Sequence, residues 1–507
     1  MNGQGTHLAR AAEAAFERRG DYESLLFEGR WYRSGELFDR AAAVATGLAQ
    51  LGVAPGERVA VTMANCPEVG IVYQAVWRAG LVATPAMFLL PAEDLRHLLA
   101  DSGARAVVTT PDSLDKVQRA VSGIDPEPIV ICTDRGASGV ISLAELEAAA
   151  PGPIVPRADD DLAALLYTGG TTGRAKGVML SHEALHYVGS AAHAASHIDG
   201  IDRSLGTLPL SHAYGLLVTV SGFHSVSRDV AVLLRWFHPE AFLSAIEDHG
   251  LQQTAVVPSM LQALLAHPLE QYDLSTLQQV TSGASPLPPE TEREFVRRVP
   301  SASIRQGYGL TESAALVSSS PAGRVRAGSV GVPVPGCEVE IRDEHGRALP
   351  AGEAGEICVR SPGLMLGYWN APETTAHAIR DGWLHTGDVG RLDENGYLYL
   401  VDRIKDLIIR GGFNVYPRDV EDALVEHPDV TMAAVVGAPS ATHGEEVVAF
   451  VSLREGTDVT PDQLVEWARA RIGGYKYPRR INVVDVIPLT PVGKVDRKAL
   501  RERLGSA

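Results

Sequence analysis

The segment Tyr167-Thr-Gly-Gly-Thr-Thr-Gly-Arg-Ala-Lys-Gly177 follows an apolar run, Leu162–Leu166, and is the strongest local signal in this 507-residue sequence. Its four glycines let the backbone approach a ligand closely, and its three threonines and one lysine offer donors to phosphate oxygens. It is not a Walker A loop, because Lys176 precedes Gly177 and a strand-like stretch, whereas that motif opens a helix. A solvated hairpin turn is the alternative interpretation, but a turn alone needs neither the hydroxyls nor the lysine.

Outward from this segment, the first 320 residues alternate between helix-like and strand-like patterns. Candidate helices cover 37–51, 68–78 and 93–100, and candidate strands cover 58–63, 81–85 and 104–109. Such alternation is typical of helices packed on largely parallel sheets. The sequence therefore predicts an α/β fold.

The pattern changes twice toward the C-terminus. After about residue 327, short β-rich pieces between Gly/Pro turns predict a small antiparallel or barrel-like subdomain over about 327–400. Beyond Asp402, helices over 418–426 and 461–472 and strands over 430–436, 447–453 and 480–486 indicate a separate α+β domain. We therefore predict a large domain over 1–403 and a small C-terminal domain over 404–507.

The composition excludes several classes of protein. Hydrophobic residues make up 45 % of the chain, which suits a large core and not a disordered chain. The net charge of −17, from 45 basic and 62 acidic residues, argues against nucleic acid or an anionic membrane as partner. The four cysteines form no C-x-x-C pair, which argues against a zinc site or a disulfide framework. With no long apolar stretch and no secretory signal, we expect a cytoplasmic protein without a transmembrane segment.

Two motifs in the middle of the chain combine groups that suit a nucleotide. Gln306-Gly-Tyr-Gly-Leu-Thr-Glu-Ser313 places an aromatic ring, a hydroxyl and a carboxylate on a glycine-rich loop. The ring suits a base, while the hydroxyl and carboxylate suit phosphate and Mg²⁺. Upstream, the small residues of Thr281-Ser-Gly-Ala-Ser-Pro286 form a backbone that can pack against a nucleobase. Each motif alone is equally compatible with an ordinary loop.

The remaining motifs lie near the C-terminus: Trp383-Leu-His-Thr-Gly-Asp388, Asp402-Arg-Ile-Lys-Asp406, Arg410–Pro417 and Thr490-Pro-Val-Gly-Lys494. Taken together, all these segments resemble the adenylate-forming superfamily of acyl-CoA synthetases, coumarate–CoA ligases, luciferases and the adenylation domains of peptide synthetases. The resemblance covers roughly residues 20–505, with the motifs in the family's order and spacing.

The phosphate loop departs from the family pattern at two positions. Many relatives have serine where Gly169 stands and proline where Ala175 stands. The missing serine removes one phosphate donor, but Thr168, Thr171 and Thr172 remain.

The resemblance implies a two-step reaction that uses ATP, Mg²⁺ and CoA. A carboxylate attacks the α-phosphate of ATP, pyrophosphate leaves, and a thiol then attacks the acyl carbon of the acyl-adenylate. The enzyme supplies no covalent nucleophile. It aligns two anions and offsets their charge, which is positioning and electrostatic stabilisation.

By the same resemblance, individual residues acquire expected roles. The β- and γ-phosphates would be held by Thr168, Gly169, Gly170, Thr171, Thr172, Gly173 and Lys176. The adenine would lie between Tyr308 and Gly283, Ala284 and Ser285, with Gln306 at its amino edge and Gly307 and Gly309 beside the nucleotide. Asp388 and Arg403 would bind the ribose, Thr311 the α-phosphate and Glu312 the Mg²⁺. Lys494 would lie between the two reacting anions, although taken alone it is equally a solvated loop lysine.

The acid itself is only partly constrained. His212, in Pro209-Leu-Ser-His-Ala-Tyr-Gly215, matches the family's acyl-site histidine, and a core-packed histidine is the alternative. No aspartate occurs between residues 205 and 228 to pair with an α-ammonium group, and Gly307 stands where malonate-activating relatives tend to have arginine. The small residues Gly307, Gly309 and Ala314 therefore predict a roomy pocket for an apolar acyl, aryl or alicyclic acid.

Three functional classes compete for this sequence. We favour an AMP-forming CoA ligase, with CoA passing Gly411 and Gly412 and with Lys405 as the hinge of a mobile C-terminal domain. A stand-alone enzyme that loads a separate carrier protein is the runner-up, and a luciferase-type oxygenase is third. No phosphopantetheine-serine motif follows the last helix, which favours a free thiol acceptor. The enzyme is expected to be a monomer or a homodimer, and a non-enzymatic binding module is least compatible with Glu312, Asp388 and Lys494 together.

Overall fold

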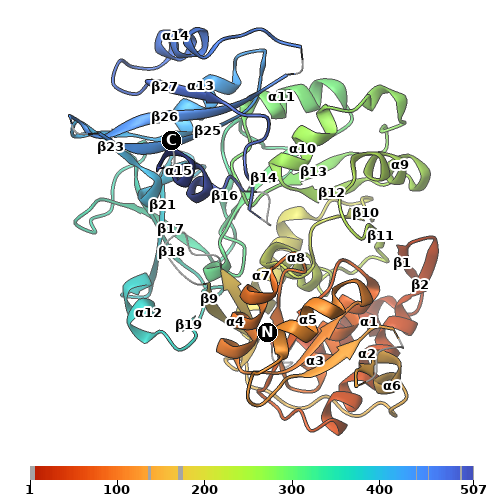
Figure 1. Ribbon diagram of the computed structural model, residues 1–507. Helices are drawn as coiled ribbons and strands as arrows, with labels where there is room; N and C mark the ends of the chain where they lie inside the picture. Colours follow the sequence, from red (N-terminus) through yellow and green to blue (C-terminus); the bar gives the residue numbers. More distant parts are fainter. Residues whose placement is uncertain are drawn as a thin grey trace.

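The computed structural model describes residues 6–134, 139–168, 175–440, 442–454, 456–490 and 494–505. These residues form four sheets (Figure 1). Two large, mostly parallel sheets with their helices make up the N-terminal part, a β-rich unit follows, and the C-terminal residues form a unit of their own at the top of Figure 1. None of the described helices has the length and apolarity needed to cross a membrane.

The first large sheet has eight strands. Six of them run parallel, and β9 and β19 extend the sheet with antiparallel pairs beside β8. In spatial order the strands are β19 (Gly367–Tyr368), β9 (Lys176–Ser181), β8 (Leu162–Thr168), β4 (Val82–Pro85), β3 (Arg58–Thr62), β5 (Ala104–Thr109), β6 (Ile129–Cys132) and β7 (Ile141–Ser142). Every strand predicted from the periodicity of the first 110 residues is present, within one residue of its expected bounds.

The second large sheet has nine strands and is parallel over its central six. In spatial order they are β16 (Val332–Pro333), β15 (Ser318–Ser319), β14 (Ser303–Tyr308), β13 (Gln279–Ser282), β12 (Gln253–Val256), β10 (Arg203–Gly206), β11 (Val230–Leu233), β1 (Glu23–Phe27) and β2 (Arg30–Arg33). The helices of this part are α1 (Leu8–Arg19), α2 (Ser34–Gln50), α3 (Pro67–Arg78), α4 (Ala92–Ser102), α5 (Leu114–Val121), α6 (Leu143–Glu147), α7 (His182–Ser196), α8 (Ala213–Ser221), α9 (Pro239–His249), α10 (Pro258–Leu265) and α11 (Pro289–Arg298).

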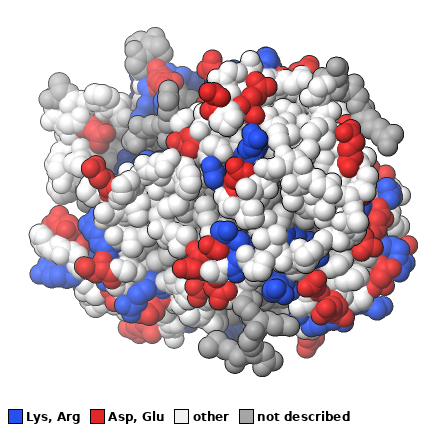
Figure 2. Space-filling model, turned by 90° about the horizontal axis from the view of Figure 1, so that it is seen from below, with Lys and Arg blue, Asp and Glu red and all other residues white. Residues whose placement is uncertain are grey.

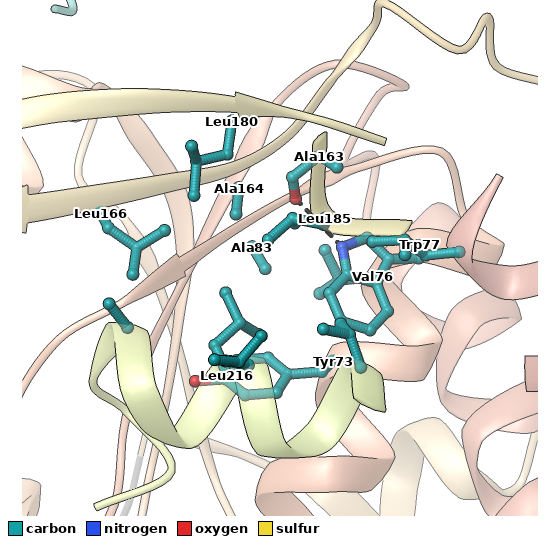
Figure 3. Close-up of a cluster of buried hydrophobic side chains, with 14 of the residues drawn as sticks. Tyr73, Val76, Trp77, Ala83, Ala163, Ala164, Leu166, Leu180, Leu185 and Leu216 are labelled. Carbon is teal, nitrogen blue, oxygen red and sulfur yellow. Dashed lines mark hydrogen bonds between the residues drawn. The ribbon is translucent and has the colours of Figure 1, made fainter. Parts of the chain in front are cut away.

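The core between α3, α8 and the first sheet fixes the segment that precedes α8. Tyr73 and Trp77 of α3 are fully buried against Leu166 and Leu216 (Figure 3). The Trp77 indole N–H donates to Ala163 O at 3.0 Å. The Tyr73 hydroxyl donates to the carbonyl of Leu210, two residues before His212, also at 3.0 Å. The buried α3 helix therefore anchors the loop that presents His212.

The β-rich unit is an antiparallel sheet of β17 (Glu338–Arg342), β18 (Gly355–Arg360), β21 (Trp383–Leu392), β20 (Ile379–Arg380) and β22 (Leu398–Arg403), with α12 (Pro372–Ala378) beside it. The C-terminal unit contains β24 (Phe413–Val415), β23 (Ile408–Arg410), β26 (Gly444–Leu453), β25 (Val430–Ser440) and β27 (Arg480–Val483), with α13 (Pro417–Val425), α14 (Pro461–Arg471) and α15 (Arg497–Gly505). Its two hydrophobic clusters contain only residues from Ile408 onward. The division at 403/404 stays a prediction.

Acidic and basic side chains are interspersed on the face shown in Figure 2. All four cysteines are buried and carry free thiols. Cys66 and Cys337 belong to the main hydrophobic cluster, whereas Cys358 lies beside His385 and Glu356, as described below.

Candidate active site

Lys494, from the C-terminal unit, lies among charged residues of the preceding units. The pKa of Lys494 is lowered to about 8, chiefly by burial and also by the positive charges of Arg403 and Lys405, while the negative charges of Asp388 and Glu312 oppose this. Four residues predicted from three separate motifs therefore lie near enough to Lys494 for their charges to shift its pKa.

Lys494 is hydrogen-bonded to Thr490 through two main-chain N–H groups. The Lys494 N–H donates to Thr490 Oγ1 at 3.2 Å, and the Thr490 N–H donates to Lys494 O at 2.7 Å. Burial, together with the nearby Lys494, lowers the pKa of His212 to about 4, so this ring is neutral at ordinary pH. His212, which was predicted for the acyl site, therefore lies near Lys494.

Asp388 receives two hydrogen-bonding partners from distant segments. The Tyr308 hydroxyl donates to Asp388 Oδ2 at 2.7 Å, and Arg403 Nε lies 3.0 Å from Oδ1. Arg403 pairs with Asp388 directly across β21 and β22. Both groups predicted for the ribose subsite thus contact each other, and Tyr308 is tied to them by its hydroxyl.

An irregularity in the β18–β21 pairing aims Asp388 at the site. Cys358 pairs with His385 and Glu356 pairs with Val389, so residues 386–388 bulge out of the ladder. Glu356 fastens this bulge, because its Oε1 accepts the Gly387 N–H at 3.1 Å and its Oε2 lies 2.8 Å from His385 Nδ1. Glu356 was missed in the sequence because its partners lie about 30 positions away.

Glu356, Cys358 and His385 are also residue types that bind metals, and their ligand atoms lie within 4.8 Å of one another. Burial raises the pKa of the Cys358 thiol to about 12, and both carboxylate oxygens of Glu356 already accept N–H groups or face a ring nitrogen. A hydrogen-bonded support for the bulge accounts for the arrangement.

Glu312 and Lys176 both contact Tyr368. The Tyr368 hydroxyl donates to Glu312 Oε1 at 2.8 Å, and Lys176 Nζ lies 5.4 Å from the centroid of the Tyr368 ring. Thr311 and Glu312 open a short 3₁₀ turn and are both partly exposed. Tyr368 carries no signal by itself, since Gly-Tyr dipeptides are common, and only the pairing of β19 with β9 reveals it.

The predicted phosphate loop joins two antiparallel strands. Thr168 ends β8, Lys176 begins β9, and the two residues pair directly. Because Lys176 opens a strand and not a helix, the exclusion of a Walker A loop is confirmed. The predicted phosphate-binding residues Gly169, Gly170, Thr171, Thr172 and Gly173 lie outside the described residues.

The predicted adenine residues lie at the ends of neighbouring parallel strands, β13 and β14. A Cβ at Gly283 would lie 3.3 Å from the ring of Tyr214 and 3.6 Å from Gly307 O, and partly exposed Ser285 follows. Ala284 has a φ of +68°, a strained value for alanine that often marks a ligand site. The Gln306 side-chain amide donates to Glu292 Oε2 at 3.0 Å.

The predicted acyl pocket needs one correction. Gly307 leaves space, since a Cβ there would meet only Ser318 O, at 3.4 Å. Gly309 leaves none, because a Cβ would lie 2.3 Å from the backbone of Ala315, so this glycine serves close packing. Ala314 is buried behind the same turn, with a φ of +49°. The prediction that Gly309 adds space to the acyl pocket is therefore wrong.

His212 caps α8, and its Nδ1 accepts the Tyr214 N–H at 3.3 Å. Its Nε2 is therefore the protonated nitrogen of the neutral ring. His212 as a whole residue is partly exposed, and its role at the acyl site stays a prediction.

Gly411 and Gly412 form the turn between β23 and β24, with φ values of +58° and +82°. These positive angles demand glycine on conformational grounds. A Cβ at Gly412 would meet nothing within 4 Å, and one at Gly411 would meet only His443 of the same unit. In this arrangement, Lys494 is at the site and the glycine turn contacts its own unit.

The segment around Lys405 connects the two parts of the chain. The Arg418 N–H donates to Asp402 Oδ2 at 3.0 Å, and the Arg418 guanidinium donates to Leu400 O at 3.1 Å. Arg501 Nη2 lies 3.1 Å from Asp406. Burial raises the pKa of Asp402 to about 6. Residues after Lys405 are thus bonded to residues before it.

Comparison with known proteins gives matches over almost the whole chain. The family description "AMP-binding enzyme" matches residues 12–369, and "AMP-binding enzyme C-terminal domain" matches residues 419–494. A feruloyl-CoA synthase from Amycolatopsis sp is 37 % identical over 474 residues, covering 93 % of each chain. A fatty acid–[acyl-carrier-protein] ligase, ScoC, from Streptomyces coeruleorubidus is 35 % identical over 491 residues, covering 95 % of this chain and 93 % of its own.

A solved structure shares this arrangement. The amide bond synthetase McbA from Marinactinospora thermotolerans is 32 % identical, with a TM-score of 0.89, and the match covers 98 % of this chain and 99 % of that one. The predicted fold class, a large N-terminal α/β part with a β-rich unit and a smaller C-terminal α+β unit, is confirmed.

Proposed function

The chain belongs to the family of AMP-binding enzymes, and from that premise we propose that it is an AMP-forming acid–thiol ligase. It activates a carboxylic acid with ATP, releases pyrophosphate, and transfers the acyl group to CoA. The observation that carries this proposal is the gathering of Lys494, Glu312, Asp388, Arg403 and His212 at one site, with Lys494 supplied by the C-terminal unit.

In the first half-reaction the residues position charge. Lys494 lies between the acid carboxylate and the α-phosphate, where its ammonium group offsets their repulsion. Asp388 and Arg403 bind the ribose. Lys176 and the glycine- and threonine-rich segment before it bind the β- and γ-phosphates. Glu312 offers a carboxylate oxygen, the ligand type that Mg²⁺ prefers, and Mg²⁺ supplies charge neutralisation of the phosphates when bound.

In the second half-reaction a thiol attacks the acyl carbon, and AMP leaves. We propose that the C-terminal unit turns about Lys405, so that Lys494 withdraws and the Gly411-Gly412 turn approaches the site. The small turn leaves its surroundings open in the present arrangement, which supports a later contact with the pantetheine chain.

The acid is proposed to be apolar, and an aryl acid is favoured. Gly307 leaves space, since a Cβ there would meet only Ser318 O, and the neutral His212 and the partly buried Tyr214 supply no charge to pair with a second carboxylate. The feruloyl-CoA synthase relative fits this class. The ScoC and McbA names keep a carrier protein or an amine as the alternative acceptor.

An acid panel tests the proposal. Aryl, alicyclic, straight-chain and dicarboxylic acids are assayed for pyrophosphate release and AMP formation, each with CoA, with a purified phosphopantetheinyl carrier protein, and with a primary amine. We expect aryl acids to give AMP and thioester only with CoA. Thioester formed only on the carrier protein, or amide formed without CoA, would show that CoA is not the acceptor. The proposed adenylation step would still stand.

A further inference from the structure

Tyr368 lies between a candidate metal ligand and a candidate phosphate ligand. Its hydroxyl donates to Glu312 Oε1 at 2.8 Å, and its ring faces Lys176 Nζ at 5.4 Å from the centroid. Among the described residues, Glu312 Oε2 accepts no hydrogen bond, and Glu312 and Lys176 form no ion pair with each other. Tyr368 therefore contacts a candidate metal ligand with its hydroxyl and a candidate phosphate ligand with its ring.

The surroundings hold Tyr368 firmly in this place. Its N–H donates to Thr375 Oγ1 at 2.8 Å, and a Cβ at the preceding Gly367 would lie 2.8 Å from Thr375 Cγ2. On its other side, the Trp369 N–H donates to Gly177 O at 2.7 Å, and the Trp369 indole donates to Asp101 O at 3.0 Å. The tyrosine is thus clamped between α12 and β9.

The backbone of the same short segment also supports Glu312. The Met365 N–H donates to Glu312 O at 2.9 Å, so residues 365–368 bind both the main chain and the side chain of this glutamate.

We propose that Tyr368 is a positioning residue of the metal–phosphate subsite, which rests on the proposed function above. Its hydroxyl fixes one oxygen of Glu312 and leaves the other free for Mg²⁺, a cation that demands strict ligand geometry. Its ring holds the Lys176 ammonium by a cation–π contact and keeps it from neutralising Glu312. Both charges are thereby kept available for Mg²⁺ and for the phosphates.

Two substitutions separate these roles. Tyr368→Phe keeps the ring and removes the hydroxyl, so the Mg²⁺ concentration for half-maximal pyrophosphate exchange should rise roughly tenfold, the effect of losing a hydrogen bond to a charged group. Tyr368→Leu also removes the ring, and the KM for ATP should rise by a further factor of about 3. The KM for the acid should stay unchanged in both variants.

The matched control is Tyr397→Phe. The Tyr397 hydroxyl donates to Arg324 O at 2.9 Å, and Arg326 lies 4.1 Å from its ring centroid, so the same two contacts exist away from the site. Its loss should lower thermal stability without moving the Mg²⁺ requirement.

Binding of Mn²⁺ with ATP, followed by electron paramagnetic resonance without any acid, gives a readout independent of turnover. Tyr368→Phe should weaken this binding, and the double variant Glu312→Gln/Tyr368→Phe should be no weaker than Glu312→Gln alone, because the hydroxyl acts through Glu312. Wild-type Mn²⁺ affinity and Mg²⁺ dependence in Tyr368→Phe would overturn the positioning role while the ligase function stands. A wild-type enzyme that adenylates no acid would instead refute the function, and the Mn²⁺ titration would still decide the role of Tyr368.

Discussion

At the scale of single residues, the lowered pKa of Lys494 predicts the direction in which activity changes with pH. Burial lowers its pKa to about 8, so the ammonium loses its proton as the pH rises through that value. The kcat/KM for pyrophosphate exchange, which reports the free enzyme, should therefore fall about tenfold per pH unit above the pKa. His212 is already neutral there and adds nothing to this limb, given its pKa of about 4. Lys494→Arg should abolish the alkaline fall whatever its effect on rate, and an unchanged limb would assign it to another group.

At the scale of elements, the bulge between β18 and β21 sets the direction of Asp388. Glu356→Ala removes the acceptor of the Gly387 N–H and of His385, so the bulge should relax and the KM for ATP should rise roughly tenfold. The loss should be smaller with 2′-deoxy-ATP, which lacks one ribose hydroxyl. Glu338→Ala, which breaks an exposed ion pair with Arg360 on the same sheet, is the control and should leave both values unchanged. Equal losses with both nucleotides would show that the bulge does not serve the ribose.

At the scale of the whole molecule, the expected motion turns on Lys405. Rotation there must break the contacts of Arg418 with Leu400 and Asp402, because Arg418 follows Lys405 in the chain and its two partners precede it. Lys405→Pro restricts φ and should uncouple the half-reactions: adenylate formation persists, and thioester formation from supplied acyl-adenylate falls at least a hundredfold. Lys494→Ala should give the reverse pattern. If both variants slow both half-reactions equally in single-turnover assays, the two-arrangement scheme is wrong.

The sequence predicted local features better than distant contacts. Strands such as Arg58–Thr62 and helices such as Pro67–Arg78 were predictable because periodicity is a local property. The bond from Tyr308 to Asp388 joins residues 80 positions apart, and that from Tyr368 to Glu312 joins residues 56 apart, so no spacing rule reveals them.

The roles of glycines were also hard to predict, because the sequence does not show which atoms a side chain at that position would meet. Gly309 avoids the Ala315 backbone and makes no room for an acid. Gly412 has a φ of +82°, so its turn conformation alone favours glycine, whether or not CoA passes it. Only the three-dimensional structure distinguishes a glycine that leaves open space from a glycine that avoids a steric clash.

The three cations at the junction of the units have a consequence for the order of events. Arg403 and Lys405 both lower the pKa of Lys494, which means that the present arrangement brings like charges together. We expect a bound nucleoside triphosphate to act as their shared counter-ion and so to stabilise the C-terminal unit in this position. Departure of pyrophosphate removes most of that negative charge, and the mutual repulsion of the cations then favours separation. Pyrophosphate release is thus expected to favour the rotation by itself, without a separate signal.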